Sequence, residues 1–161
     1  MALDTTECPI HKPLDFNIQS KFYSGKAGMH TIKYEIGTEL YTGKFIWLHG
    51  GRCGSIHDLE IARSSGILQQ LSLGEYIMAD KAYIGEFQFI TAFKNPQTNQ
   101  EKTFNSIIYS MRIIVENSLN RIKFFTFTQK DWRHKLELHS IAFTALINIL
   151  NIDIKFRPLR K

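Results

Sequence analysis

Cysteine is scarce in this chain of 161 residues, which contains only Cys8 and Cys53. Two cysteines are too few for a disulfide framework, which indicates a reducing compartment. Long apolar runs are also lacking, because the longest one, IAFTALINIL at 141–150, is about half of a membrane span and contains Asn148. We therefore expect a core helix there and no membrane partner. The first residues, MALDTTECPIHKP, carry acids where a secretory signal needs an apolar region.

The chain also lacks repeats, low-complexity blocks and linkers that would divide it into parts. Its content of 43% hydrophobic and 22% charged residues is typical of an ordinary globular protein. A chain of this length can bury roughly 70% of its unfolded surface. We therefore expect a single domain over residues 1–161.

Acidic residues are in the minority, and the formal net charge is +5. The basic excess gathers in two segments, RIKFFTFTQKDWRHK at 121–135 and KFRPLRK at 155–161. Basic residues interleaved with aromatic ones suit a polyanion that can be neutralised and stacked upon. A solvated helix face followed by a frayed tail has the same charge pattern, so the net charge alone leaves both interpretations open.

Strand patterns dominate the first half of the chain. The segments HTIKYEIGTEL at 30–40 and GKFIWLHGG at 43–51 alternate apolar and polar residues, which predicts the two strands of a hairpin. GSIHDLEIARSSGILQQL at 54–71 has a helical pattern, and its Ser55 precedes Asp58 at the spacing of a capping box. A further short strand is expected to end at Asp80, and another apolar segment, FQFITAF, follows at 87–93.

The second half of the chain has helical periodicity. From Phe104 past Ile122 the apolar residues fall on one stripe at about 100° per residue, and Glu116 lies outside that stripe. A final helix is predicted from Lys135 to Leu150. Early strands with helices at intervals predict an α/β or α+β domain in which helices cover one sheet.

Four acids occupy informative positions: Asp4 ends the first short strand, Asp58 begins a helix, Asp80 ends another strand, and Glu116 lies in the long helix. A hard divalent cation such as Mg²⁺ prefers carboxylate oxygens on rigid elements. Two such ions about 4 Å apart can activate a nucleophile and stabilise the leaving oxygen of a phosphodiester. Each acid also has an ordinary interpretation: a turn residue for Asp4, a helix cap for Asp58, a surface strand end for Asp80, and a partner of Arg112 for Glu116.

A second metal hypothesis involves the sulfur and imidazole ligands that zinc prefers. Cys8 and His11 form one pair, and His49, Cys53 and His57 follow at spacings of four residues. The first pair lacks the second helix or knuckle that closes a structural zinc site, so the carboxylate hypothesis is favoured.

Five short motifs follow one another along the chain: LDTTE at 3–7, YSGKAGMHTIKYEI at 23–36, GSIHDLEIAR at 54–63, ADKAY at 79–83 and FNSIIYSMRIIVENSLNRIK at 104–123. In this order they resemble the catalytic domain of Harbinger-type transposases of the DDE superfamily. The specificity of the resemblance lies in the ordered set, which covers nearly the whole chain. The separation between Asp80 and Glu116 is typical of that superfamily.

The resemblance implies an α/β, RNase H-like fold in which helices flank a mixed five-stranded sheet. It also implies that Asp4, Asp80 and Glu116 form a catalytic triad and, with Asp58 as a further acid, bind Mg²⁺ or Mn²⁺. The partner would be DNA. The basic residues expected to contact its phosphates are Arg112, Arg121 and Lys123, with Lys26 and Lys33 as further candidates.

The first function that we expect is a divalent-metal-dependent DNA endonuclease with transposase-type strand transfer. The alternative is a catalytically inactive, transposase-derived module that binds DNA or protein. A third hypothesis is an inert remnant of a mobile element, because the strand that ends at Asp4 is expected to be truncated. The family implies a nuclear location, with the cytoplasm as the alternative, a separate DNA-binding protein that supplies target recognition, and a homo-oligomer.

Overall fold

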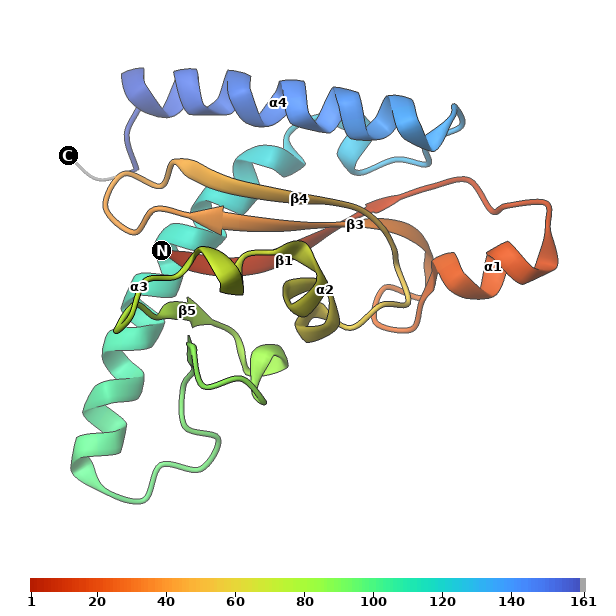
Figure 1. Ribbon diagram of the computed structural model, residues 1–161. Coiled ribbons are helices and arrows are strands. Elements are labelled where there is room, and N and C mark those ends of the chain that lie inside the picture. The colour runs from red at the N-terminus through yellow and green to blue at the C-terminus, as the bar shows by residue number, and fades with distance from the viewer. Residues whose placement is uncertain (160–161) are drawn as a thin grey trace.

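The computed structural model describes residues 1–159. A mixed sheet of six strands lies between helices, with α4 on one face and α2 on the other (Figure 1). The strands are β1 (Ala2–Pro9), β2 (Tyr23–Ser24), β3 (Met29–Thr38), β4 (Phe45–Cys53), β5 (Ile77–Ala79) and β6 (Phe89–Ile90). The helices are α1 (Phe16–Phe22), α2 (Asp58–Ser65), α3 (Asn99–Lys123) and α4 (Leu136–Phe156), with short 3-10 turns at Leu68–Gln70, Lys81–Tyr83 and Thr126–Thr128.

The sheet is built around β1 and β3. These two strands pair antiparallel over all eight residues of β1, and β3 pairs antiparallel with β4 on its other side. On its second edge β1 pairs parallel with β5, which pairs parallel with β6. The fold is therefore α/β with a mixed sheet, as predicted, and it is consistent with an RNase H-like architecture. The short β2, which pairs with the start of β3, adds a sixth strand to the five expected.

Alternation along β1 sends successive side chains to opposite faces of the sheet. Leu3 packs with Ile77 and Tyr83 on the α2 side, whereas Ala2 packs with Met78 and Val115 on the α3 side. A third core cluster joins β3 to α4. Its stacked ring pair is Tyr34 of β3 and Phe143 of α4, whose centroids are 3.9 Å apart. Because Asp4 follows Leu3, the alternation directs its side chain toward α3.

The hairpin predicted at 30–51 is confirmed by β3 and β4. The long helix begins earlier than the expected Phe104, at Asn99, because Thr98 and Glu101 form a capping box there. The capping box predicted at Ser55 is wrong: the residue that precedes the first turn of α2 is His57, and Asp58 is already helical.

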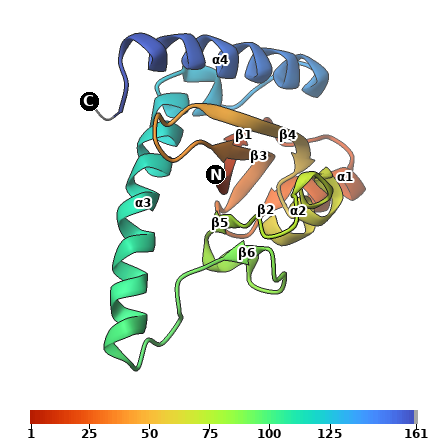
Figure 2. The ribbon, with the colours of Figure 1, turned by 60° about the vertical axis from the view of Figure 1, so that its left-hand side comes forward.

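Helix α4 extends to Phe156, six residues beyond its predicted end. By length and composition alone it could cross a membrane, with a mean hydropathy of 1.2 over its most apolar stretch, of which 33% is buried. The predicted core helix is confirmed for one face, where Phe143, Leu146, Leu150 and Ile154 pack against the sheet. The other face is apolar as well and is exposed. In Figure 2, α4 crosses one end of α3 at a wide angle.

Candidate functional site

The parallel register of β1 and β5 brings two of the predicted acids together. Ala2 pairs with Met78 and Leu3 with Ala79. The next residues are Asp4, which lies inside β1 and not at its end as predicted, because pairing with β3 continues to Pro9, and Asp80, which follows the last residue of β5. Both side chains line one small hollow at this edge of the sheet, together with Arg112 and Val115 of α3. Residues that are 76 positions apart in sequence thus meet because two short strands run side by side in the same direction.

Arg112 connects this pair of acids to the third predicted acid. Its Nη1 donates a hydrogen bond of 2.8 Å to Oδ1 of Asp80, and its Nη2 lies 3.9 Å from Oε1 of Glu116. Arg112 and Glu116 are one helical turn apart on α3, so both side chains project from the same side of the helix. Glu116 remains the most exposed of the three acids, and its side chain retains 59% of its accessible surface.

The two aspartates of the hollow differ in their protonation equilibria. Burial raises the pKa of Asp4, and the neighbouring charge of Asp80 raises it further, although the amide of Thr5 and the Arg112 guanidinium act in the opposite direction. Partial burial also acts to raise the pKa of Asp80. There, however, the hydrogen bond from the Lys81 amide and the charge of Arg112 prevail, and its pKa lies below the usual range. Asp80 is therefore ionised at neutral pH.

Asp58 lies on the other face of the sheet and has a different partner. The Nζ of Lys33, on β3, is 3.1 Å from Oδ1 of Asp58, 3.5 Å from Oε1 of Glu7 and within hydrogen-bond distance of the carbonyl of Ile56. Only 6% of Lys33 is exposed. A phosphate contact by Lys33 is therefore wrong, because its ammonium group is enclosed by protein acceptors. The metal role of Asp58 stays a prediction, and its carboxylate is already paired with a buried cation.

The predicted DNA-contacting residues Arg121 and Lys123 also have protein partners. Nη1 of Arg121 donates to Oδ2 of Asp153 on α4 at 3.0 Å, and its Nη2 donates to the carbonyl of Arg157. The ammonium of Lys123 donates to the carbonyl of Glu7. Both side chains hold the end of α3 against neighbouring elements. Their DNA contacts stay predictions, and the final two basic residues of the chain lie outside the described residues.

Within residues 1–159 no group of three or more His, Cys, Asp or Glu side chains is close enough to hold a metal ion. Cys8 of the zinc hypothesis lies in the apolar core, where burial raises the pKa of its thiol to about 11. Asp4 and Asp80 have the hard oxygen donors that Mg²⁺ and Mn²⁺ prefer, and they already share a hollow, so their donor chemistry fits such an ion. Glu116 is connected to them through Arg112.

Two further charged residues lie near the acids: Lys26, which the sequence indicated only as an additional phosphate contact, and Glu35, which the sequence did not indicate. Lys26, in the turn between β2 and β3, is exposed, and its charge contributes to the low pKa of Asp80. Glu35 of β3 is fully buried and accepts a hydrogen bond of 3.0 Å from Nε1 of Trp47. Burial raises the pKa of Glu35, and nearby Asp58 adds to the effect. The strand alternation predicted a polar side for β3, but no sequence signal shows that α2 covers that side.

Comparisons with known proteins show what the chain is similar to. Residues 3–151 match a family model described as DDE superfamily endonuclease. A protein of Microchaete diplosiphon named "Probable transposase for insertion sequence element IS702" is 29% identical over 165 aligned residues. The alignment covers 98% of this chain and 58% of that relative, so the chain spans less than two thirds of the relative's length. No solved structure matches the chain.

Proposed function

Because the chain belongs to the DDE superfamily endonuclease family, we propose that it cleaves DNA phosphodiester bonds with Asp4, Asp80 and Glu116 as its acidic site. The observation that carries the proposal is the parallel register of β1 and β5, which places Asp4 beside Asp80. The family generally depends on divalent metal, and the relative's name adds transposition as the biological context. The two acids are neighbours because of how two strands pair, and not because two surface side chains happen to lie close together.

In the proposed mechanism Asp4, Asp80 and Glu116 would hold Mg²⁺ or Mn²⁺. When bound, such an ion neutralises phosphate charge and lowers the pKa of a bound water. Asp80 is ready to bind a cation because it is ionised at neutral pH. Burial raises the pKa of Asp4. A bound cation would lower that pKa again, because a nearby positive charge favours the ionised carboxylate. Binding of Glu116 to the same ion requires the Arg112 contact to rearrange.

Arg112 and Lys26 would contact the phosphates of the DNA backbone. A guanidinium presents two parallel N–H groups that match the oxygens of a phosphate. Arg112 lies at the hollow with 25% of its side chain exposed, so one of its edges can face solvent and substrate. The exposed Lys26 adds positive charge near Asp80. Together these side chains would position a phosphodiester over the acids.

The alternative function, a DNA- or protein-binding module without catalysis, has one observation in its favour. Arg112 forms an ion pair with Asp80 and approaches Glu116, so a basic side chain already neutralises the acids that a metal ion would require. Such a module would bind DNA without any dependence on divalent metal. The two functions therefore differ in whether metal changes the behaviour of the protein at all.

The test is cleavage of supercoiled plasmid DNA in Mg²⁺ or Mn²⁺, with the wild type and Asp80→Asn compared at equal concentration. We expect at least a hundredfold loss of cleavage in the variant, because the neutral amide is a far weaker metal ligand. Asp131→Asn is the matched control, since Asp131 is exposed and lies in the loop before α4. Thermal melts establish that all three proteins are folded.

Cleavage that survives Asp80→Asn would contradict the proposed acidic site. A folded wild type that binds DNA but neither cleaves it nor responds to metal would establish the binding module instead. The absence of a cooperative melt would favour the inert remnant.

The finer assignments are further proposals. The Harbinger-type subtype rests on the ordered motifs, and strand transfer rests on the transposase resemblance. A nuclear location and a separate DNA-binding partner also rest on that resemblance alone.

A further inference from the structure

The side of α4 that faces away from the sheet carries an unbroken apolar stripe. Six residues at spacings of three and four positions form it: Leu138, Ile141, Ala145, Ile149, Ile152 and Phe156. The exposed fraction is 50% for Leu138, 66% for Ile141 and 75% for Phe156. Within residues 1–159 no element lies over this side of the helix (Figures 1 and 2). We call these six residues the outer stripe.

The outer stripe has the pattern of a helix seam. Spacings of three and four residues keep its members on one side of the helix over the whole of α4, which is how helices that pack along their length arrange their contact residues. Ile149 also borders an apolar groove of about 440 Å³ between the ends of α3 and α4, which Phe124, Phe125 and Leu150 help to line. The apolar surface therefore extends beyond a single row of side chains.

We propose that the outer stripe is a dimer interface, on which α4 of a second copy of this chain packs antiparallel. The positions of the stripe are nearly symmetric about the middle of the helix. A two-fold axis near residue 146 would place Leu138 against the partner subunit's Phe156 and Ile141 against the partner subunit's Ile152. Ala145 lies near that axis, where a small side chain allows close approach of the two helices. An isologous interface requires this kind of self-complementary surface.

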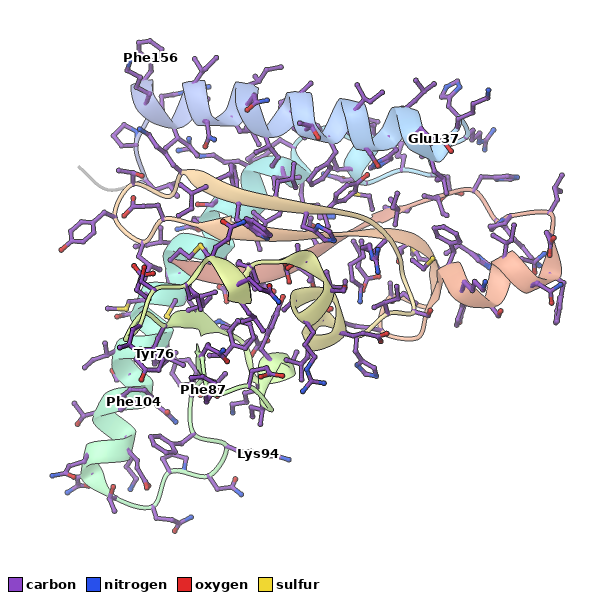
Figure 3. All side chains as sticks on the ribbon, viewed as in Figure 1. Tyr76, Phe87, Lys94, Phe104, Glu137 and Phe156 are labelled. Carbon is purple, nitrogen blue, oxygen red and sulfur yellow. The ribbon has the colours of Figure 1, made fainter. Side chains whose placement is uncertain are left out.

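Charge supports the choice of a second copy and of the antiparallel orientation. Glu137 and Lys155 are 18 residues apart, which is about five complete turns, so they lie on the same flank of the outer stripe at opposite ends of α4. Figure 3 shows Glu137 at one end of the helix and Phe156 projecting from the other. In an antiparallel pair equivalent flanks face each other, so Glu137 meets the partner subunit's Lys155, twice by symmetry. In a parallel pair the equivalent flanks lie on opposite sides of the seam, so Glu137 and Lys155 would not meet.

The size of the surface sets the expected strength of association. One helix face from each subunit is at the low end of specific protein interfaces. We therefore expect a reversible equilibrium with a dissociation constant on the order of micromolar. Such a dimer would leave the hollow at Asp4 and Asp80 uncovered, because α4 packs over β3 and β4, whereas the hollow lies at β1 and β5 (Figure 1).

Sedimentation velocity of the full chain over a hundredfold range of concentration tests the proposal. We expect a monomer–dimer equilibrium in the wild type and at least a tenfold weaker association in Ile141→Glu, which would place two charges in the seam. Leu73→Glu is the matched control, because Leu73 is fully exposed in the loop before β5. Circular dichroism melts establish that each variant is folded.

A charge exchange separates the proposed pairing from unspecific association. Glu137→Lys and Lys155→Glu should each weaken the dimer severalfold, and the double variant should restore it, because opposite charges then meet again. A monomer at every concentration would overturn the proposal, as would a dimer indifferent to Ile141→Glu. Failure of the double variant to recover would overturn the antiparallel orientation. Flotation of the wild type with phosphatidylcholine vesicles would assign the stripe to a membrane instead. None of these outcomes bears on DNA cleavage.

Discussion

Arg112 affects the protonation of Asp80 more than it affects the stability of the fold. It forms an ion pair with Asp80 at 2.8 Å, and both side chains are partly exposed, so the pair contributes only about 0–1 kcal/mol to the free energy of unfolding. Its larger effect is on protonation, because its positive charge opposes the burial that would raise the pKa of Asp80. The residue thus keeps a predicted metal ligand ionised while it holds that ligand beside Glu116.

We expect Arg112→Ala to raise the pKa of Asp80 toward or above its ordinary value. The reason is that desolvation remains while the neighbouring positive charge and its hydrogen bond are lost. Carbon-detected NMR titration of the Asp80 carboxyl measures this directly. Arg112→Lys keeps the charge and should shift the pKa less. An unchanged pKa in Arg112→Ala would show that the Lys81 amide alone maintains the ionised state.

At the scale of elements, α4 is attached to the sheet through an aromatic cluster centred on a buried histidine. His139 is fully buried, and its Nδ1 lies 2.8 Å from the hydroxyl of Tyr34 on β3. The rings of Phe127, Trp132 and Phe143 surround it. Burial lowers the pKa of His139 to about 4, and the positive charge of Lys123 adds to this effect. The helix is therefore docked by an imidazole that must remain neutral.

This docking predicts a loss of stability in mild acid. Because the folded-state pKa is below the unfolded value of about 6.5, the unfolded chain binds the proton first. The stability is complete above about pH 6.5 and falls as the pH decreases toward 4, by up to about 3 kcal/mol. Urea unfolding at several pH values measures it. His139→Asn cannot titrate, so its stability should depend less on pH in this window; an equal slope in both proteins would contradict the account.

At the scale of the whole molecule, the basic side chains behind the net charge of +5 have two different roles. Some basic side chains are structural: Arg121 ties α3 to Asp153 of α4, and Lys33 is buried between two acids. Others, such as Lys26, are exposed and close enough to the acidic hollow to influence Asp80. The net charge therefore does not predict how many DNA phosphates the protein can neutralise.

The two uses predict different responses to mutation. Lys26→Ala should reduce the salt dependence of DNA binding, lowering the magnitude of the slope of log K against log salt by about 0.9, the value for one phosphate contact. Arg121→Ala should change that slope less than Lys26→Ala does and should lower the free energy of unfolding, because the Arg121–Asp153 ion pair joins α3 to α4. Fluorescence anisotropy at several salt concentrations, combined with urea unfolding, measures both quantities. Reversed results for the two variants would show that Arg121 is the phosphate contact.

The sequence by itself determined the local elements and the family resemblance. Alternation at 30–51 predicted the hairpin of β3 and β4, and helical periodicity predicted α3 and one face of α4. These features depend on residues close together in the chain, where backbone propensity and side-chain period act directly. The ordered motifs predicted membership of the DDE superfamily, and the match of residues 3–151 to the family model confirms it.

Only the tertiary structure decided which charged groups meet. Asp4 and Asp80 are neighbours because β1 and β5 pair in parallel with one register, and a slip by one residue would send one of them to the other face. The burial of Lys33 with Asp58 likewise depends on where α2 packs. Such contacts join residues far apart in sequence, and register and packing, which no local pattern encodes, determine them.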